Sequence, residues 1–403
     1  MTERIEKMHG PTRASACDNA FTSSEVPRVL HVIGAMDRGG AETFIMNLYR
    51  TIDRKVIQFD FLVNEQRECD YDKEIRSLGG NIYSIPRFTG SNIFSFYSAC
   101  KSFFLLHHEY IAVHIHIGSS AALVIKAAKL FNLYTIAHSH ACHFPLSPSE
   151  LAFRAASYPT RFLADYYFAC SQQAGIDRFG ASVASGNRFR VISNGIPTES
   201  FKYNKDARNR IRTSLGINAD APVLIHVGRL SPEKNHRFLL DIFRCIKQIN
   251  TEATLLIVGR GPLESDLKQY AKLLEVDEST LFLGIRNDVQ DLLCASDIFV
   301  FPSTSEGLAI AVIESQAAGL SCVVSSELPE ESSVTNLVSR LSLNISPEKW
   351  AEHIIEILSE NQTRERARYA NLVAEAGFDI QRTAEFLSQF YLSHSLGSRL
   401  SQN

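Results

Sequence analysis

Two cations with a fixed spacing occur in Gly228-Arg229-Leu-Ser-Pro-Glu-Lys234-Asn235. The segment follows Pro222-Val-Leu-Ile-His-Val-Gly228, a short apolar run that predicts a buried parallel strand. Open α/β sheets bind ligands at the carboxyl ends of their strands. A guanidinium offers a two-pronged contact and an ammonium a mobile point charge, so Arg229 and Lys234 together suit a diphosphate. A solvated basic loop has the same composition and is the alternative.

Two carboxylates frame the segment Glu306-Gly-Leu-Ala-Ile-Ala-Val-Ile-Glu314, which follows an apolar run that ends at Phe301. Two residues that are eight positions apart on one helix lie about 12 Å from each other along its axis, so Glu306 and Glu314 cannot both bind one small group. Glu306 is expected at the mouth of the helix and Glu314 about two turns inside. Glu314 has apolar neighbours, which favours a buried carboxylate with a polyol partner over a solvated helix position.

The helix between these carboxylates is expected to begin near Gly307 and to end at Gly319. Its first turn would leave the backbone N–H groups of Leu308 and Ala309 without helical partners. Those groups and the helix dipole suit a pyrophosphate.

Two adjacent glycines, Gly39 and Gly40, lie between the apolar run Arg28–Gly34 and a helical segment at Ala41–Thr51. They permit close backbone approach to a ligand, and the helix start offers N–H groups to a phosphate. The spacing is neither that of the dinucleotide fingerprint nor that of a P-loop. A plain tight turn is the competing interpretation.

Four histidines cluster on two expected strands. His114 and His116 alternate on the first, and His138 and His140 follow the second. A histidine at the carboxyl end of a strand can donate to a developing charge or orient a substrate hydroxyl, although a structural role is more common. We predict no metal site, because no carboxylate or thiol recurs beside them at ligand spacing.

Two series of alternating strands and helices must position these residues, which predicts two parallel sheets covered by helices. A polar leader is expected at 1–27, an N-terminal domain at 28–200, a C-terminal domain at 201–375 and a last helix with a polar tail at 376–403. The expected strands are Arg28–Gly34, Gln58–Val63, Asn81–Ile85, Ile111–Ile117, Tyr134–Ala137, Tyr166–Cys170, Pro222–Gly228, Ala253–Val258, Leu281–Leu283, Ile298–Phe301 and Ser321–Ser325. The expected helices include Asp70–Leu78, Asn92–His107, Ala121–Leu130 and Phe378–Tyr391.

The composition suits a cytoplasmic two-domain protein. The chain has 403 residues, a formal net charge of −3 and 45% hydrophobic residues, which disfavours a nucleic-acid binder with a basic surface. The eight cysteines include no C-x-x-C pair, so we expect reduced thiols.

Together these motifs resemble the retaining glycosyltransferases of family 4, which have the GT-B fold of two Rossmann-like domains facing a cleft. The resemblance covers about residues 28–392. It is closest to the bacterial branch that builds exopolysaccharide, capsule and O-antigen units. The motifs that carry it are Gly39-Gly40-Ala-Glu42, Ser193-Asn-Gly-Ile196, the Gly228–Asn235 segment, Gly259-Arg-Gly261-Pro262, Phe282-Leu-Gly284 and Glu306–Glu314.

The resemblance implies a metal-independent hexosyltransferase that binds a nucleotide sugar, with UDP the best guess, and needs no cofactor. Arg229 and Lys234 would neutralise the diphosphate and Glu314 would bind the ribose. Glu306 would meet the transferred sugar, and His138 would lie at the reacting centre, with His140 as the alternative. The remaining donor contacts implied are Gly39, Gly40, Gly261, Ile285, Arg286, Gly307, Leu308 and Ala309, and the C-terminal helix is expected to pack back on the N-terminal domain.

In this branch the acceptor is commonly a polyprenyl-diphosphate-linked sugar or an oligosaccharide, which suggests peripheral contact with the inner face of the membrane. Aromatic and basic residues at Phe88–Tyr97 with Lys101, Phe103 and Phe104, and at Phe144–Phe162 with Arg154 and Arg161, are the candidate surfaces. The alternative interpretation is that these aromatics fill the core of the first domain. An epimerase of the same fold and a non-enzymatic sugar-nucleotide binder are the alternative functions.

Overall fold

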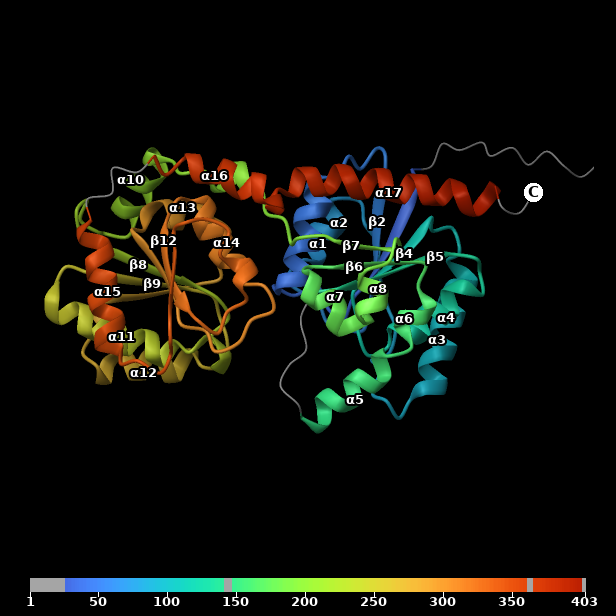
Figure 1. The fold of residues 1–403 in the computed structure, drawn as a ribbon, viewed down its shortest axis with the longest axis horizontal. Helices are drawn as coiled ribbons and strands as arrows, with labels where there is room; N and C mark the ends of the chain where they lie inside the picture. The colour runs from blue at the N-terminus through green and yellow to red at the C-terminus, as the bar shows by residue number, and fades with distance from the viewer. Residues whose placement is uncertain (1–25, 141–146, 361–364, 401–403) are drawn as a thin grey trace, which may run out of the picture.

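Two parallel sheets stand side by side, each covered by helices (Figure 1). The computed structural model describes residues 26–140, 147–360 and 365–400, so residues 1–25 of the predicted leader lie outside the described residues. Every strand pair of the two sheets in the described residues is parallel. The predicted fold class is therefore confirmed.

The N-terminal sheet has the strand order β3-β2-β1-β4-β5-β6-β7 within the described residues. Its central strands are short apolar runs buried on both faces. In β1, Val29 enters one core and Leu30 the other. The strands are β1 Arg28–Val32, β2 Gln58–Val63, β3 Ile82–Ser84, β4 Ala112–Ile115, β5 Tyr134–Ser139, β6 Tyr166–Ala169 and β7 Phe189–Val191. The helices are α1 Gly40–Thr51, α2 Asp72–Ser77, α3 Ile93–Leu106, α4 Ala121–Lys129, α5 Pro148–Ser157, α6 Thr160–Leu163, α7 Gln172–Phe179 and α8 Ala181–Ala184.

The second sheet has the order β10-β9-β8-β11-β12-β13. Its strands are β8 Val223–Val227, β9 Thr254–Val258, β10 Thr280–Gly284, β11 Ile298–Phe301, β12 Ser321–Ser325 and β13 Val338–Leu341. The helices around it are α9 Thr198–Phe201, α10 Lys205–Ser214, α11 His236–Ile249, α12 Glu264–Leu273, α13 Val289–Ala295, α14 Ile310–Ala317, α15 Pro347–Ser359 and α16 Arg368–Val373. Short turns η1 Pro232–Lys234, η2 Asp277–Ser279 and η3 Glu330–Ser332 connect them, and η4 Ala374–Phe378 follows α16.

The last helix, α17 Ile380–Leu400, returns from the second sheet and lies along the N-terminal domain (Figure 1). Leu387 and Tyr391 enter a core of the N-terminal sheet. The two connecting segments also pair, because the N–H of Ile196 donates to the carbonyl of Phe378 at 2.8 Å. The expected return of the C-terminal helix is confirmed, and the helix runs further than the predicted Phe378–Tyr391.

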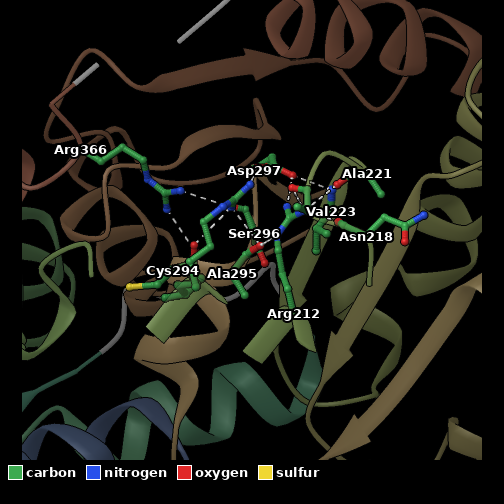
Figure 2. Close-up of polar contacts among 12 residues, drawn as sticks. Arg212, Asn218, Ala221, Val223, Cys294, Ala295, Ser296, Asp297 and Arg366 are labelled. Carbon is green, nitrogen blue, oxygen red and sulfur yellow. Dashed lines mark hydrogen bonds and ion pairs between the residues drawn. The ribbon is translucent and has the colours of Figure 1, made fainter. Parts of the chain in front are cut away.

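Buried arginines close the amino-terminal edge of the second sheet (Figure 2). The guanidinium of Arg212 binds the carboxylate of Asp297 at 2.6 Å and the carbonyl of Ala295 at 2.8 Å. The Arg366 guanidinium binds the carbonyls of Ser296 and Leu293 at 3.0 and 3.1 Å. These contacts fix the amino-terminal edge, whereas ligands of α/β sheets bind at the opposite, carboxyl-terminal edge of the strands.

Two strands were not predicted, β7 and β13. Both lie at sheet edges, and their residues are half-buried or exposed, so they lack the apolar run of a central strand. Within the described residues, none of the helices is both long and apolar enough to cross a bilayer.

Candidate functional site

Two adjoining cavities lie between the sheets. One, of about 590 Å³, is lined by Arg38, Thr43 and Tyr71 of the N-terminal domain and by Arg229, Ile285, Arg286 and Glu314, among others, of the C-terminal domain. The second, of about 360 Å³, shares Arg38, Thr43, Arg229 and Glu314 with the first and adds Gly39, Gly40, Lys234, Glu306, Leu308 and Ala309. The cleft thus gathers nearly all the predicted donor residues. Gly307 does not line either cavity, but its neighbours do.

Arg229 follows strand β8 and reaches both cavities with an exposed side chain. Its guanidinium has no hydrogen-bond or ion-pair partner recorded among the described residues. Lys234 ends the turn η1, and the left-handed Asn235 (φ 54°) then redirects the chain into α11. Two cations at the carboxyl end of a central strand, one of them unpaired, form a site for an anion.

Lys234 and Glu306 contact each other directly. The Lys234 Nζ lies 2.5 Å from Glu306 Oε1, and the Ser303 hydroxyl donates to the same oxygen at 2.6 Å. The sequence analysis assigned these residues to different parts of a ligand, the diphosphate and the sugar. The structure brings them together as one ion pair beside the cavity.

The expected start of the helix near Gly307 is wrong. Helix α14 begins at Ile310, so Glu306 lies in the preceding loop and not on the same helix as Glu314. A contact with another loop holds this loop in place, because the Thr304 N–H donates to the Glu233 carbonyl at 2.8 Å, and the Ser303 hydroxyl oxygen lies at the same distance from that carbonyl. The Ala309 N–H is not free, since it donates to the Ser332 hydroxyl at 3.3 Å.

Glu314 lies in α14 and lines both cavities. Burial raises the pKa of its carboxyl group to about 8. No hydrogen-bond partner for its carboxylate is recorded among the described residues. An unpaired acceptor at such a position suits a ligand that brings hydroxyl donors.

The glycine loop approaches the second domain closely. Gly39 caps α1, and a Cβ placed on Gly40 would lie 3.8 Å from Ile310 Cδ1 of α14. Glu42 follows in the first turn of α1. Burial raises the pKa of the Glu42 carboxyl group, and the Arg229 cation from the facing domain opposes that shift. The two domains therefore interact electrostatically across the cleft.

Arg38 bridges the domains at the loop after β10. Its guanidinium donates to the Arg286 carbonyl at 3.1 Å and to the Asn287 side-chain oxygen at 2.7 Å. The Arg286 side chain is itself paired with Asp288 at 2.6 Å. The exposed Ile285 and the backbone of Arg286 are thus what this loop offers to the larger cavity.

Gly261 lines the larger cavity, and its lack of a side chain has a structural cause. A Cβ there would lie 2.3 Å from the Leu230 carbonyl oxygen. Only glycine lets the loop after β9 pack on the loop after β8, which fixes the backbone around Arg229.

His138 lies outside these two cavities. It lines a smaller cavity of the N-terminal domain together with His116 and His140. Its Nδ1 lies 3.1 Å from His114 Nε2, and its Nε2 is buried without a partner. His140 uses both ring nitrogens, one with His116 at 2.7 Å and one with Asn194 at 3.3 Å. Of the two candidates, His138 alone keeps a nitrogen for a ligand.

Comparison with known proteins decides the family. The profile described as Glycosyltransferase Family 4 matches residues 38–200, and the profile described as Glycosyl transferases group 1 matches residues 207–372. A Bacillus subtilis protein named “Putative glycosyltransferase EpsF” is 33% identical over 377 residues, covering 92% of this chain and 97% of EpsF. The chain belongs to the family 4 glycosyltransferases.

Other relatives agree with this assignment. The capsular polysaccharide biosynthesis glycosyltransferase CapH of Staphylococcus aureus is 25% identical and covers 92% of this chain and 99% of CapH. The crystal structure of Anabaena HepE in complex with UDP and glucose superposes with a TM-score of 0.73 at 21% identity, over 90% of this chain and 100% of that one. That likeness shows the GT-B fold, and this chain is an enzyme of the glycosyltransferase class.

The cleft of this glycosyltransferase contains residues that the sequence analysis missed, namely Asp37, Arg38, Thr43, Asp70 and Tyr71. Arg38 stands within the Gly34–Gly40 motif, so its place before the double glycine was a usable signal. Asp70 and Tyr71 come from the loop before α2, where the Asp70 carboxylate accepts from the Arg38 N–H at 3.2 Å. Nothing in their local sequence points to the cleft, because that contact joins distant segments.

Proposed function

We propose that this glycosyltransferase moves a hexose or N-acetylhexosamine from a UDP-sugar to a lipid-linked or oligosaccharide acceptor in surface polysaccharide biosynthesis. The observation that carries the proposal is the unpartnered Arg229 cation, which faces a cleft shared with Lys234, Glu306 and Glu314. In this proposal residues 201–375 bind the donor and residues 28–200 the acceptor, with retention of anomeric configuration and without a divalent metal.

The relatives support the choice of substrates. An Escherichia coli relative is named a UDP-Gal:alpha-D-GlcNAc-diphosphoundecaprenol alpha-1,3-galactosyltransferase, and it is 31% identical over 239 residues, covering 55% of this chain and 59% of that enzyme. CapH is named for capsular polysaccharide biosynthesis, and HepE was crystallised with UDP and with UDP-glucose. A UDP-sugar and a diphospholipid-linked sugar are thus the substrates to test first.

Arg229 and Lys234 would neutralise the diphosphate as it leaves. The bond from the anomeric carbon to the diphosphate oxygen breaks, the acceptor oxygen bonds on the same face, and its proton passes to the departing oxygen. Lys234 would exchange Glu306 for the diphosphate, which frees the Glu306 carboxylate to accept from sugar hydroxyls. Electrostatic stabilisation of the leaving group is then the largest catalytic contribution from the protein.

The other residues would position the donor. Glu314 would accept from the ribose hydroxyls, and the backbone at Ile285 and Arg286 would contact the base. The Leu308 amide, and the Ala309 amide once released from Ser332, would donate to the diphosphate. Gly39 and Gly40 would admit the donor phosphate close to α1.

Thermal melting with UDP, GDP, ADP, CMP and NAD, with and without EDTA, tests the donor site. We expect UDP alone to raise the melting temperature, with no effect of EDTA, since a ligand that binds the native state stabilises it. Proton NMR of a UDP-sugar incubated without acceptor serves as the control for an epimerase, which would convert the donor by itself into an isomer of the same mass. No shift with any nucleotide, or a shift abolished by EDTA, would contradict the proposal.

A membrane-facing surface remains a proposal for the N-terminal domain. Phe96, Phe103 and Phe104 of the predicted surface are core residues, whereas Phe94 is 90% exposed. Phe162, at 69% exposure, and Tyr158 lie beside Arg161, whose guanidinium stacks on the Tyr158 ring at 4.0 Å. Residues 144–146 of the second predicted surface lie outside the described residues.

Flotation with anionic liposomes tests this surface. We expect the protein to float with the vesicles and the double variant Phe94→Ser/Phe162→Ser to stay in the soluble fraction, because exposed aromatics beside cations bind the bilayer interface. Leu273→Ser, which removes a side chain 76% exposed on α12 of the other domain, is the matched control. Equal flotation of all three proteins would contradict the assignment of this surface to membrane binding.

A further inference from the structure

A third cavity, of about 210 Å³, lies in the N-terminal domain beyond the carboxyl ends of β4 and β5. Among the described residues it shares no lining residue with the two cleft cavities. The polar side chains that line it include His138, Glu150, Thr160 and Arg178. The carboxyl edge of a parallel sheet is where α/β domains bind ligands, so the cavity has the position of a second site.

Three of the lining residues carry buried polar atoms that have no partner in the part of the chain that the structure describes: His138 Nε2, Thr160 Oγ1 and Arg178 Nη1. Buried polar groups are hydrogen-bonded in the great majority of native structures, and each exception calls for an explanation. Three such atoms around one cavity are explained together if a ligand supplies their partners.

The Arg178 guanidinium contributes a positive charge that no residue neutralises directly. It stacks on the Phe153 ring at 4.3 Å, and its side chain has no hydrogen bond or ion pair recorded among the described residues. The nearby carboxylate of Glu150 is bonded to Arg154 at 2.8 Å. Burial lowers the pKa of Arg178 to about 10, which still leaves it charged at neutral pH. The charges that act on Arg178 are the carboxylates of Glu150 and Asp177 and the guanidinium of Arg154, so Arg178 is a cation in a locally balanced group that has no direct partner recorded among the described residues.

The C-terminal helix, through Tyr391, determines which ring nitrogen of His138 carries the proton. The Tyr391 hydroxyl lies 2.6 Å from His114 Nδ1, and His114 Nε2 lies 3.1 Å from His138 Nδ1. Burial lowers the pKa of both histidines well below its usual value, so both rings are neutral. If Tyr391 donates to His114, then His114 donates to His138, and His138 carries its proton on Nε2. If instead His138 donated to His114 and His114 donated to Tyr391, the proton of the buried Tyr391 hydroxyl would be left without an acceptor in this series of hydrogen bonds.

Hydrogen bonds also occupy the other two histidines at this cavity. His116 Nδ1 pairs with His140 Nε2 at 2.7 Å, and His116 Nε2 pairs with His31 Nδ1 at 3.0 Å. Among the described residues that line the cavity, the unpartnered groups are therefore three donors, from His138, Thr160 and Arg178, and the last of these is a cation. This set fits a ligand rich in acceptor oxygens and negatively charged.

We propose that this cavity binds an oxyanion carried by a sugar, a carboxylate or a phosphate, on the acceptor substrate. The proposal rests on the acceptor role of the N-terminal domain in the proposed function. At 210 Å³ the cavity is below the roughly 300 Å³ of a small drug-sized pocket, so it takes a single sugar ring or its charged substituent. Tyr391 and His114 act on this site as positioning residues, through His138.

Titration calorimetry with the full-length protein tests the proposal. The ligands are glucuronate, glucose 1-phosphate and glucose, and UDP is titrated separately. We expect the carboxylate or the phosphate ligand to bind at least tenfold more tightly than glucose, and the stronger of the two identifies the source of the oxyanion. Arg178→Gln is expected to abolish that preference while UDP binding stays unchanged. Arg188→Gln, which changes an exposed arginine of the same domain, is the matched control.

A second measurement covers the case in which Arg178→Gln does not fold. In wild-type protein labelled with ¹⁵N-histidine, the His138 Nε2 resonance is expected to report a protonated nitrogen and to shift when the anionic sugar binds. Tyr391→Phe is expected to shift the His138 tautomer, a readout that a purely packing role would leave unchanged. No shift with either anionic sugar, or equal binding of glucose, would overturn the proposal.

The experiments distinguish failure of the proposed donor site from failure of the proposed oxyanion site. Protein that binds UDP and no anionic sugar keeps the donor site and loses this inference. Protein that binds an anionic sugar but no nucleotide keeps this inference and loses the proposed donor.

Discussion

Arg229→Ala is expected to lower kcat by about 10²–10³-fold while leaving the melting temperature unchanged. The large loss follows from the role of the guanidinium, which stabilises charge that develops on the diphosphate only as the sugar leaves. The unchanged stability follows from the structure, because no side chain loses a hydrogen bond or ion pair recorded among the described residues when Arg229 is removed. Release of nucleotide from the donor in the presence of acceptor measures the first effect, and circular dichroism measures the second.

Lys234→Ala is expected to differ from Arg229→Ala in its effect on stability. We expect a similar loss of turnover but a lower melting temperature, because Glu306 would keep only the Ser303 hydroxyl as its partner. Arg244→Ala, at an exposed position of α11, is the control for lost positive charge on the same domain. Near-normal turnover in Arg229→Ala or Lys234→Ala would refute the assigned roles.

Much of this site was predictable because the loops that follow parallel strands meet at one edge of the sheet, where α/β domains bind their ligands. The apolar runs before Gly34, Gly228 and Glu306 predicted β1, β8 and β11, and the motifs that follow them had to meet between the sheets. By contrast, β7 and β13 were missed because these two of the four edge strands in the described residues contain no buried residue and so lack an apolar run.

Contacts between distant segments were not predictable. The helix was expected to start near Gly307, yet the Thr304 N–H donates to the Glu233 carbonyl, which lies in another loop. The same holds for the Lys234–Glu306 pair and for Tyr391, which reaches His114 only because α17 returns to the first sheet. Local pattern specifies elements, and tertiary contacts decide their ends and their side-chain partners.

The buried Glu314 carboxyl group is expected to lower stability at high pH and to strengthen donor binding there. Stability and donor affinity should therefore change with pH in opposite directions. Its folded-state pKa of about 8 is higher than the ordinary 4.5 of the unfolded chain. Between these values the native state holds more protons than the unfolded state, so stability falls as pH rises from 4.5 through 8. Glu314→Gln carries no charge and escapes this loss. The variant is therefore expected to melt at a higher temperature than wild type at pH 8.5, with the difference shrinking toward pH 5.

Donor binding is expected to change in the opposite direction. An ionised carboxylate accepts from ribose hydroxyls more strongly than the neutral acid does, so donor affinity is expected to rise with the ionised fraction of Glu314. With a pKa of about 8, that fraction rises about twenty-fivefold between pH 6.5 and 8.5. Calorimetric titration of the UDP-sugar should show tighter binding by about this factor in wild type and weak, pH-independent binding in Glu314→Gln. The variant would thus be more stable and less functional at the same pH, a combination that a merely solvated helix position cannot produce. Affinity in wild type that is flat across this range would contradict the ribose contact, whatever the melting temperatures show.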